Sequence, residues 1–250
     1  MTRPDPFVTA RAVVATHVPG ARQAWLAGSV VQGRATATSD LDVTVLLDDG
    51  QPHRVSLTHD GWPVELFVHT QASIRWFVAQ DLARRRPTMA RLVASGVPLL
   101  EGDAGAALRD ECAAVVAAGP PALTGDALAL ARYTLTDLLD NLAGGGQPLE
   151  VAAVAVEAWR SAAELLLSSQ GHWGGTGTWL ARELTSYDES CGTTFGPRLL
   201  DSLQAALAGD PAPLVAVADD VLALVGGRLW SGFRLEAPAE ALAAPRTGRT

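Results

Sequence analysis

The sequence predicts an α+β protein in which a domain built on a mixed β-sheet is followed by an α-helical bundle. Runs with the composition and period-two alternation of β-strands occupy much of residues 20–70, whereas apolar residues recur at helical spacing beyond about residue 73. Of the 250 residues, 48% are hydrophobic and 18% are charged, a balance that is typical of folded globular chains. The length allows one large domain or two ordinary ones.

The first predicted elements alternate between helix and strand. Pro19-Gly20 breaks the first helical pattern, Ser29 is expected to cap a short second helix, and Gly33 is expected to end it. We expect a helix over residues 7–17, a strand over 21–28 and a short helix over 29–33. A loop over 35–39 then leads to a second strand over 41–47.

A hairpin and further helices complete the first half. Residues 54–58 and 63–69 have strand composition, and the Asp60-Gly61 pair between them is typical of a tight hairpin turn. Helical spacing begins at about Ser73, is interrupted at Pro87 and resumes, and residues 96–102 form a short extended piece.

We place the domain boundary in an Ala- and Gly-rich region, giving a first domain over residues 1–105 and a helical domain over residues 106–236. The composition of residues 237–250 predicts a disordered tail. In the second domain, apolar faces predict a bundle of about five helices, over residues 127–142, 149–168, 178–184, 197–207 and 213–225.

Composition excludes several classes of protein. The chain contains no lysine, so all nineteen basic side chains are arginine, and a Walker A loop, a Schiff base and a Ser/Lys dyad are excluded. The net charge of −8 disfavours an extended nucleic-acid surface but is compatible with a cationic substrate.

Cysteine content and hydropathy indicate the cellular compartment in which the protein is expected. Only Cys112 and Cys191 are present, without a CxxC motif, which disfavours a disulfide scaffold and a structural zinc site. Because the chain has neither a secretory leader pattern nor an uninterrupted apolar run of roughly 18 residues, we expect a cytoplasmic protein that does not bind membranes.

Two aspartates, Asp40 and Asp42, stand one residue apart at the start of the second predicted strand. Their side chains should lie on the same face, where they repel each other unless a metal ion, an arginine or solvent separates them. Glu65 is a third carboxylate, in the middle of an otherwise apolar strand, and burying it unpaired would be costly. Three such oxygens suit Mg²⁺, and Gly28-Ser29 offers a close backbone approach and a hydroxyl to a phosphate.

Gly28-Ser29, then Ser39-Asp40-Leu41-Asp42-Val43 beginning ten residues after Ser29, and later Val64-Glu65-Leu66 together resemble the polymerase-β-type nucleotidyltransferases. Within that superfamily the chain most resembles the small bacterial aminoglycoside nucleotidyltransferases, which have a compact catalytic domain followed by a helical one. The specific resemblance covers about residues 20–70 and only loosely extends to the helical remainder.

The resemblance implies Mg²⁺ on Asp40, Asp42 and Glu65 and a nucleoside triphosphate, with ATP expected, as co-substrate. The implied product is a small molecule, such as an aminoglycoside, nucleotidylated on a hydroxyl group. No nucleic acid or membrane partner is implied, and a homodimer stays open. The residues implied to bind the nucleotide are Gly28, Ser29, Arg34 and Ser39.

The sequence leaves open the phosphate-binding arginine, the general base and the type of function. Gln32 stands where many members have arginine, and we expect Arg34 to substitute for it. The general base is expected on a helix of the second domain; Glu157 is our assignment, with Asp137 and Asp140 as alternatives. The alternative functions are a regulatory or antitoxin-like nucleotidyltransferase that acts on or binds a protein, and a catalytically inactive nucleotide-binding member.

Overall fold

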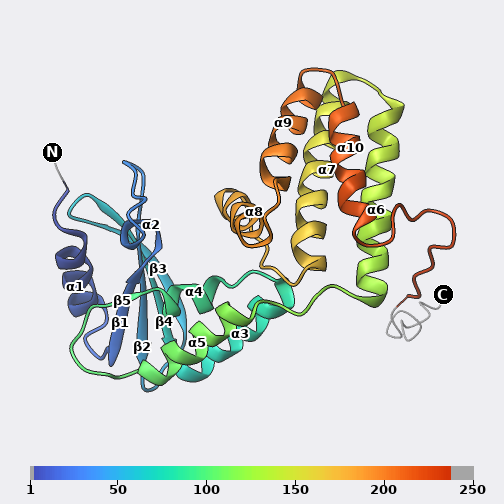
Figure 1. The fold of residues 1–250 in the computed structure, drawn as a ribbon. Helices are drawn as coiled ribbons and strands as arrows, with labels where there is room; N and C mark the ends of the chain where they lie inside the picture. The colour runs from blue at the N-terminus through green and yellow to red at the C-terminus, as the bar shows by residue number, and fades with distance from the viewer. Residues whose placement is uncertain (1–2, 238–250) are drawn as a thin grey trace, which may run out of the picture. The chain divides into compact units, whose positions relative to one another are not determined.

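The sheet of the first unit is mixed, as the sequence predicts. The computed structural model describes residues 3–237, and its internal contacts divide the chain into one unit up to Pro120 and a second from Pro121 onwards (Figure 1). The first unit contains, in chain order, α1 (Pro6–His17), β1 (Gln23–Ala27), α2 (Gly28–Val31), β2 (Leu41–Leu47), β3 (His53–His59), β4 (Trp62–Thr70), α3 (Gln71–Arg84), α4 (Thr88–Ala94), β5 (Val97–Pro98) and α5 (Ala106–Ala118).

The strands lie in the order β3-β4-β2-β1-β5. Only the β2–β4 pair is parallel among the described strands; the other neighbours are antiparallel. The β3–β4 hairpin turns at Asp60 and Gly61, with φ angles of 49° and 77°, and two consecutive positive φ angles are what a tight hairpin turn of the type I′ class requires. The hairpin predicted from the Asp-Gly pair is therefore confirmed.

The sheet carries apolar side chains on both faces, because alternate residues of each strand point to opposite sides. On β2, Leu41, Val43 and Val45 belong to the apolar cluster that includes residues of α1. Leu46 belongs instead to the cluster formed with residues of α3, α4 and α5. Packing on both faces holds β2 and β4 in place.

The boundary between the units lies after Pro120 rather than after residue 105, which corrects the expected domain limits. The reason is α5, whose Leu108 and Cys112 are buried in the same cluster as Trp25 of the sheet. Arg75 of α3 also forms an ion pair with Glu111 of α5, with an Nε–Oε2 distance of 2.8 Å. The Ala-rich sequence predicted a helix but did not show which core that helix joins.

The second unit is helical, as predicted, and its core is formed mainly by leucine and alanine side chains. The expected bundle of about five helices is confirmed for the described residues, which form α6 (Gly125–Gly144), α7 (Pro148–Ser169), α8 (Thr178–Cys191), α9 (Phe195–Leu207) and α10 (Ala212–Ala223). Within the described part of the chain, no helix is both long enough and apolar enough to cross a membrane.

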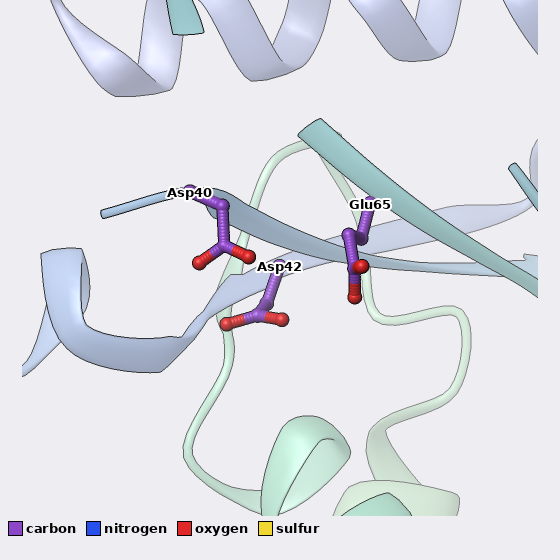
Figure 2. A group of neighbouring side chains, drawn as sticks. All are labelled: Asp40, Asp42 and Glu65. Atoms are coloured by element: carbon purple, nitrogen blue, oxygen red, sulfur yellow. The ribbon is translucent and has the colours of Figure 1, made fainter. Parts of the chain in front are cut away.

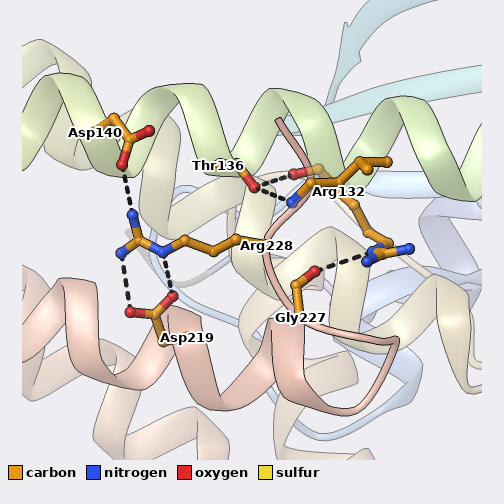
Figure 3. A network of polar contacts seen from close by, with 7 residues as sticks. Arg132, Thr136, Asp140, Asp219, Gly227 and Arg228 are labelled. Carbon is orange, nitrogen blue, oxygen red and sulfur yellow. Dashed lines mark hydrogen bonds and ion pairs between the residues drawn. The ribbon is translucent and has the colours of Figure 1, made fainter. Parts of the chain in front are cut away.

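The segment after α10 is fixed to the bundle by arginines (Figure 3). Arg228 forms ion pairs with Asp219 of α10 and Asp140 of α6, at 2.7 and 2.6 Å, and Arg132 donates to the carbonyl oxygens of Gly226 and Gly227. Asp140 therefore has a structural partner. The tail predicted over residues 237–250 lies, except for its first residue, outside the described residues.

Candidate functional site

The three carboxylates singled out in the sequence lie together, at the start of β2 and in the first half of β4 (Figure 2). Asp40 directly precedes β2, Asp42 is its second residue, and Glu65 of β4 is the register partner of Asp42. One oxygen from each of the three groups lies within 4.8 Å of the other two. The structure thus brings together residues that are 25 positions apart in the chain.

The cluster has an excess of negative charge. The pKa of Asp42 is raised to about 6, first by burial and then by the neighbouring charges of Asp40 and Glu65, with Arg54 acting in the opposite direction. Neither Asp40 nor Asp42 forms a side-chain hydrogen bond or an ion pair with any residue between 3 and 237. A cation bound between these carboxylates would therefore relieve their repulsion.

Arg54 compensates only part of the negative charge of the three carboxylates. Its guanidinium forms an ion pair with Glu65 Oε1 and stacks over Phe67, with its Cζ 5.0 Å from the ring centroid. Arg54 was not among the site residues predicted from the sequence. The signal was available, because in the predicted hairpin Arg54 pairs with Phe67, and strand alternation puts Phe67 on the face of Glu65.

Gly28 approaches the carboxylates more closely than another residue could. Its φ of +79° is unfavourable for other residues, and a Cβ atom built on it would lie 2.1 Å from Asp42 Oδ2. The backbone at the start of α2 therefore packs directly against the Asp42 carboxylate, and glycine is required there for two independent reasons.

Ser29 does not cap α2, which corrects the sequence prediction. The helix begins at Gly28, its N-cap position is Ala27, and no side chain caps it. Ser29 Oγ instead donates to Ser39 Oγ at 2.9 Å, and Ser39 Oγ accepts from the Thr36 backbone N–H at 2.8 Å. These bonds hold the loop that leads into Asp40 against α2, so Ser29 and Ser39 lie beside the carboxylates.

The remaining predicted residues lie further from the cluster or in the other unit. Arg34 is exposed, and its side chain makes no hydrogen bond or ion pair with the part of the chain that the structure describes; its backbone N–H donates to the Ser29 carbonyl at 2.9 Å. Glu157 lies on α7 of the second unit and pairs with Arg160 at 2.7 Å. Its role as general base stays a prediction.

The donor set fits a hard divalent cation. Mg²⁺ prefers carboxylate oxygens in octahedral geometry at about 2.0–2.1 Å, which places neighbouring ligand oxygens roughly 3 Å apart. Asp40, Asp42 and Glu65 would reach that spacing through small rotamer changes from the present separations. The group offers no nitrogen or sulfur ligand, so zinc is a poorer match.

Comparison with known proteins shows a likeness to solved structures. A crystal structure of a nucleotidyltransferase-like protein from Exiguobacterium sibiricum matches 88% of this chain and 75% of its own chain, with a TM-score of 0.46 and 12% sequence identity. No protein-family model and no curated protein matches the chain. The function therefore has to be argued from the site itself.

The close contact between Gly28 and Asp42 predicts the effect of two alanine substitutions. Gly28→Ala should displace the Asp42 carboxylate and weaken Mg²⁺ binding at least tenfold, measured by calorimetric titration. Gly33→Ala is the matched control, because Gly33 also has a positive φ, of +67°, but a Cβ atom there would meet nothing within 4 Å. Gly33→Ala should cost only about 1 kcal/mol of stability from backbone strain. Equal loss of Mg²⁺ binding in both variants would contradict this account.

The raised pKa of Asp42 predicts a pH dependence of stability. The folded protein holds a proton on Asp42 up to a pH of about 6, whereas the unfolded chain loses it near pH 4, so without metal the free energy of unfolding should fall as pH rises between these values. Mg²⁺ competes with that proton, and should therefore raise the melting temperature at pH 7.5 but hardly at pH 5. Asp42→Asn should remove both effects; an Mg²⁺ effect that persists in this variant would contradict the assignment.

Proposed function

We propose that this protein is a magnesium-dependent nucleotidyltransferase of the polymerase-β type, which moves a nucleoside monophosphate from a nucleoside triphosphate to a hydroxyl group. The observation that supports this most strongly is the arrangement of Asp40, Asp42 and Glu65 on adjoining strands, with the Gly28 backbone packed against Asp42. A cluster that served only the fold would not need three carboxylates with a single arginine partner among the described residues.

The chain's own residues supply binding and orientation. Asp40, Asp42 and Glu65 would hold Mg²⁺, and the bound ions would neutralise the triphosphate and favour ionisation of the attacking hydroxyl. Gly28 lets the phosphates approach the backbone at the start of α2, and Ser29 places a hydroxyl there. Because the chain has no lysine, we assign the exposed Arg34, in the loop after α2, to the phosphates.

The reaction is a displacement at the α-phosphorus. The acceptor oxygen forms the new P–O bond, the bond to the bridging oxygen of pyrophosphate breaks, and the hydroxyl proton passes to water. Because attacking and leaving oxygens lie roughly in line, the acceptor has to enter from the side opposite the leaving pyrophosphate. With the phosphates at Gly28 and Ser29, that side is the one beyond Glu65.

We assign ATP as the donor and a small molecule as the acceptor, with aminoglycosides as the class that the sequence resemblance implies. The net charge of −8 is compatible with a cationic acceptor and disfavours a nucleic acid. If the acceptor is an aminoglycoside, the activity would confer antibiotic resistance.

The test is pyrophosphate release with Mg²⁺, each of the four nucleoside triphosphates and a panel of hydroxyl-bearing small molecules that includes aminoglycosides. We expect turnover with ATP that Asp42→Asn reduces by at least 10³-fold and that Arg34→Ala weakens mainly through the KM for ATP. Arg22→Ala is a matched control, since Arg22 pairs only with exposed Asp48 among the described residues.

Two results would contradict the proposal in different ways. Mg²⁺-dependent nucleotide binding without turnover on any acceptor would favour either an inactive nucleotide-binding protein or a transferase that acts on a protein. Labelled ATP would distinguish the two, because a protein acceptor would become labelled. Absence of nucleotide binding would reject the assignment altogether.

A further inference from the structure

A cavity of about 270 Å³ adjoins the carboxylate cluster within the first unit. It lies between strands β3 and β4 and helices α3 and α4. A space of this size holds a group of one or two rings rather than a whole drug-sized ligand. The apolar part of its wall comes mainly from the side chains of Phe67, Phe77, Met89 and Leu92.

Two residues of the cavity wall adjoin the proposed active site. Arg54 lines the cavity and also forms the ion pair with Glu65. Phe67 lines it as well, and stands two residues after Glu65 on the same face of β4. A ligand in the cavity is therefore separated from the carboxylates by the Arg54 side chain rather than by backbone.

The order of the strands places the cavity on the acceptor side. Gly28 follows β1, Asp42 lies on β2, Glu65 on β4 and Arg54 on β3, which is also their order across the sheet. With the pyrophosphate leaving at the Gly28 side, an in-line acceptor enters from the β4 and β3 side, which is the side where Arg54 and Phe67 line the cavity.

From this arrangement we infer that the cavity is an acceptor subsite that binds a planar aromatic group, uncharged or anionic, carried by the hydroxyl substrate. The inference rests on the proposed transfer to a hydroxyl group and names a feature of the acceptor. It replaces the aminoglycoside assignment, because aminoglycosides are polycations without an aromatic ring. Phe67 and Phe77 provide ring contacts. Arg54 and Arg84 are each paired with one carboxylate, and their remaining guanidinium N–H groups can donate to a neutral or negative group.

An ammonium group would find no free carboxylate in this wall. Among the residues between 3 and 237, the acidic residue that lines the cavity is Asp81, which is 1% exposed. Its Oδ1 accepts from Arg84 at 2.7 Å, and its Oδ2 accepts from the Met89 backbone N–H at 2.6 Å. Since both oxygens are engaged, a polycationic acceptor would have to be held elsewhere.

His69 adds a directional group to the cavity. It is 5% exposed, and its Nδ1 lies 3.0 Å from Ser73 Oγ, whose own hydrogen is donated to the Thr70 carbonyl. The tautomer that satisfies both contacts carries its proton on Nδ1, which donates to Ser73 Oγ, and leaves Nε2 as an acceptor. Burial, with the nearby charge of His53, lowers the pKa of His69, so the ring is neutral at pH 7.

The Nε2 atom of His69 makes no hydrogen bond with the residues that the structure describes, so it is available to an N–H or O–H group of a ligand. Glu65 and His69 are four residues apart on β4, a span of about 13 Å. The acceptor inferred here is accordingly elongated: an aromatic ring with a hydrogen-bond donor at one end, and the reacting hydroxyl roughly 10 Å away.

The test uses three probes that share a phenol ring and differ in charge: 3-(4-hydroxyphenyl)propionate, 4-ethylphenol and tyramine. Binding to the full-length protein is measured by calorimetric titration without nucleotide, so that it does not depend on turnover. We expect the anionic and neutral probes to bind at least fivefold more tightly than tyramine. His69→Phe, which keeps a ring but removes the acceptor nitrogen, should weaken both by about tenfold.

A bulky substitution identifies the binding place. Thr88 lines the cavity and is exposed, so Thr88→Trp should fill the space without loss of core packing and abolish probe binding. The matched control is Ala83→Trp, on an exposed position of α3 outside the cavity wall, which should bind the probes like the wild type. Circular dichroism confirms that both variants fold.

Each result bears on the inference. Probe binding that Thr88→Trp leaves intact, or a preference for tyramine, would overturn it. Loss of Mg²⁺-ATP affinity in Thr88→Trp would also overturn it, because the cavity would then hold the nucleobase. Probe binding by a wild-type protein that shows neither nucleotide binding nor transferase activity would support the aromatic site while rejecting the proposed function.

Discussion

The parallel pairing of β2 with β4 is the constraint on which the candidate site depends. It places Glu65 directly beside Asp42, while the period of two along β2 places Asp40 on the same side. The three carboxylates then lie close together, and their like charges repel one another. Apolar clusters on both faces of the sheet supply the burial that holds the strands in register against this repulsion. The cost of the arrangement appears in the raised pKa of Asp42.

Different parts of the candidate site lie side by side on neighbouring strands of this sheet. Gly28 provides a close backbone approach at one side, the carboxylates lie in the middle, and Arg54 and the aromatic cavity follow on the other side. Residues on strands are held more precisely than residues on loops, which suits a reaction that requires in-line alignment. Under the proposed function, one sheet would in this way position the triphosphate, the metal site and the acceptor subsite.

Much of this arrangement could be predicted from local sequence. The Asp60-Gly61 turn fixed the β3–β4 hairpin, and the spacing of Asp40, Asp42 and Glu65 predicted their convergence. Long-range packing could not be predicted in the same way. Whether α5 joins the sheet or the bundle depends on which core accepts Leu108 and Cys112, and the helical pattern is the same in both cases. The role of Ser29 was missed because its partner, Ser39, meets it only after the loop between them has folded.

The central claim, that Asp40, Asp42 and Glu65 hold divalent ions together with a nucleoside triphosphate, is tested most directly by electron paramagnetic resonance of bound Mn²⁺. The titration would be made with and without a non-hydrolysable ATP analogue, on the wild type and on Asp40→Asn. The account predicts Mn²⁺ binding that tightens when the analogue is present and is lost in Asp40→Asn. Mn²⁺ binding that is indifferent to the analogue, or equal in the two proteins, would contradict it.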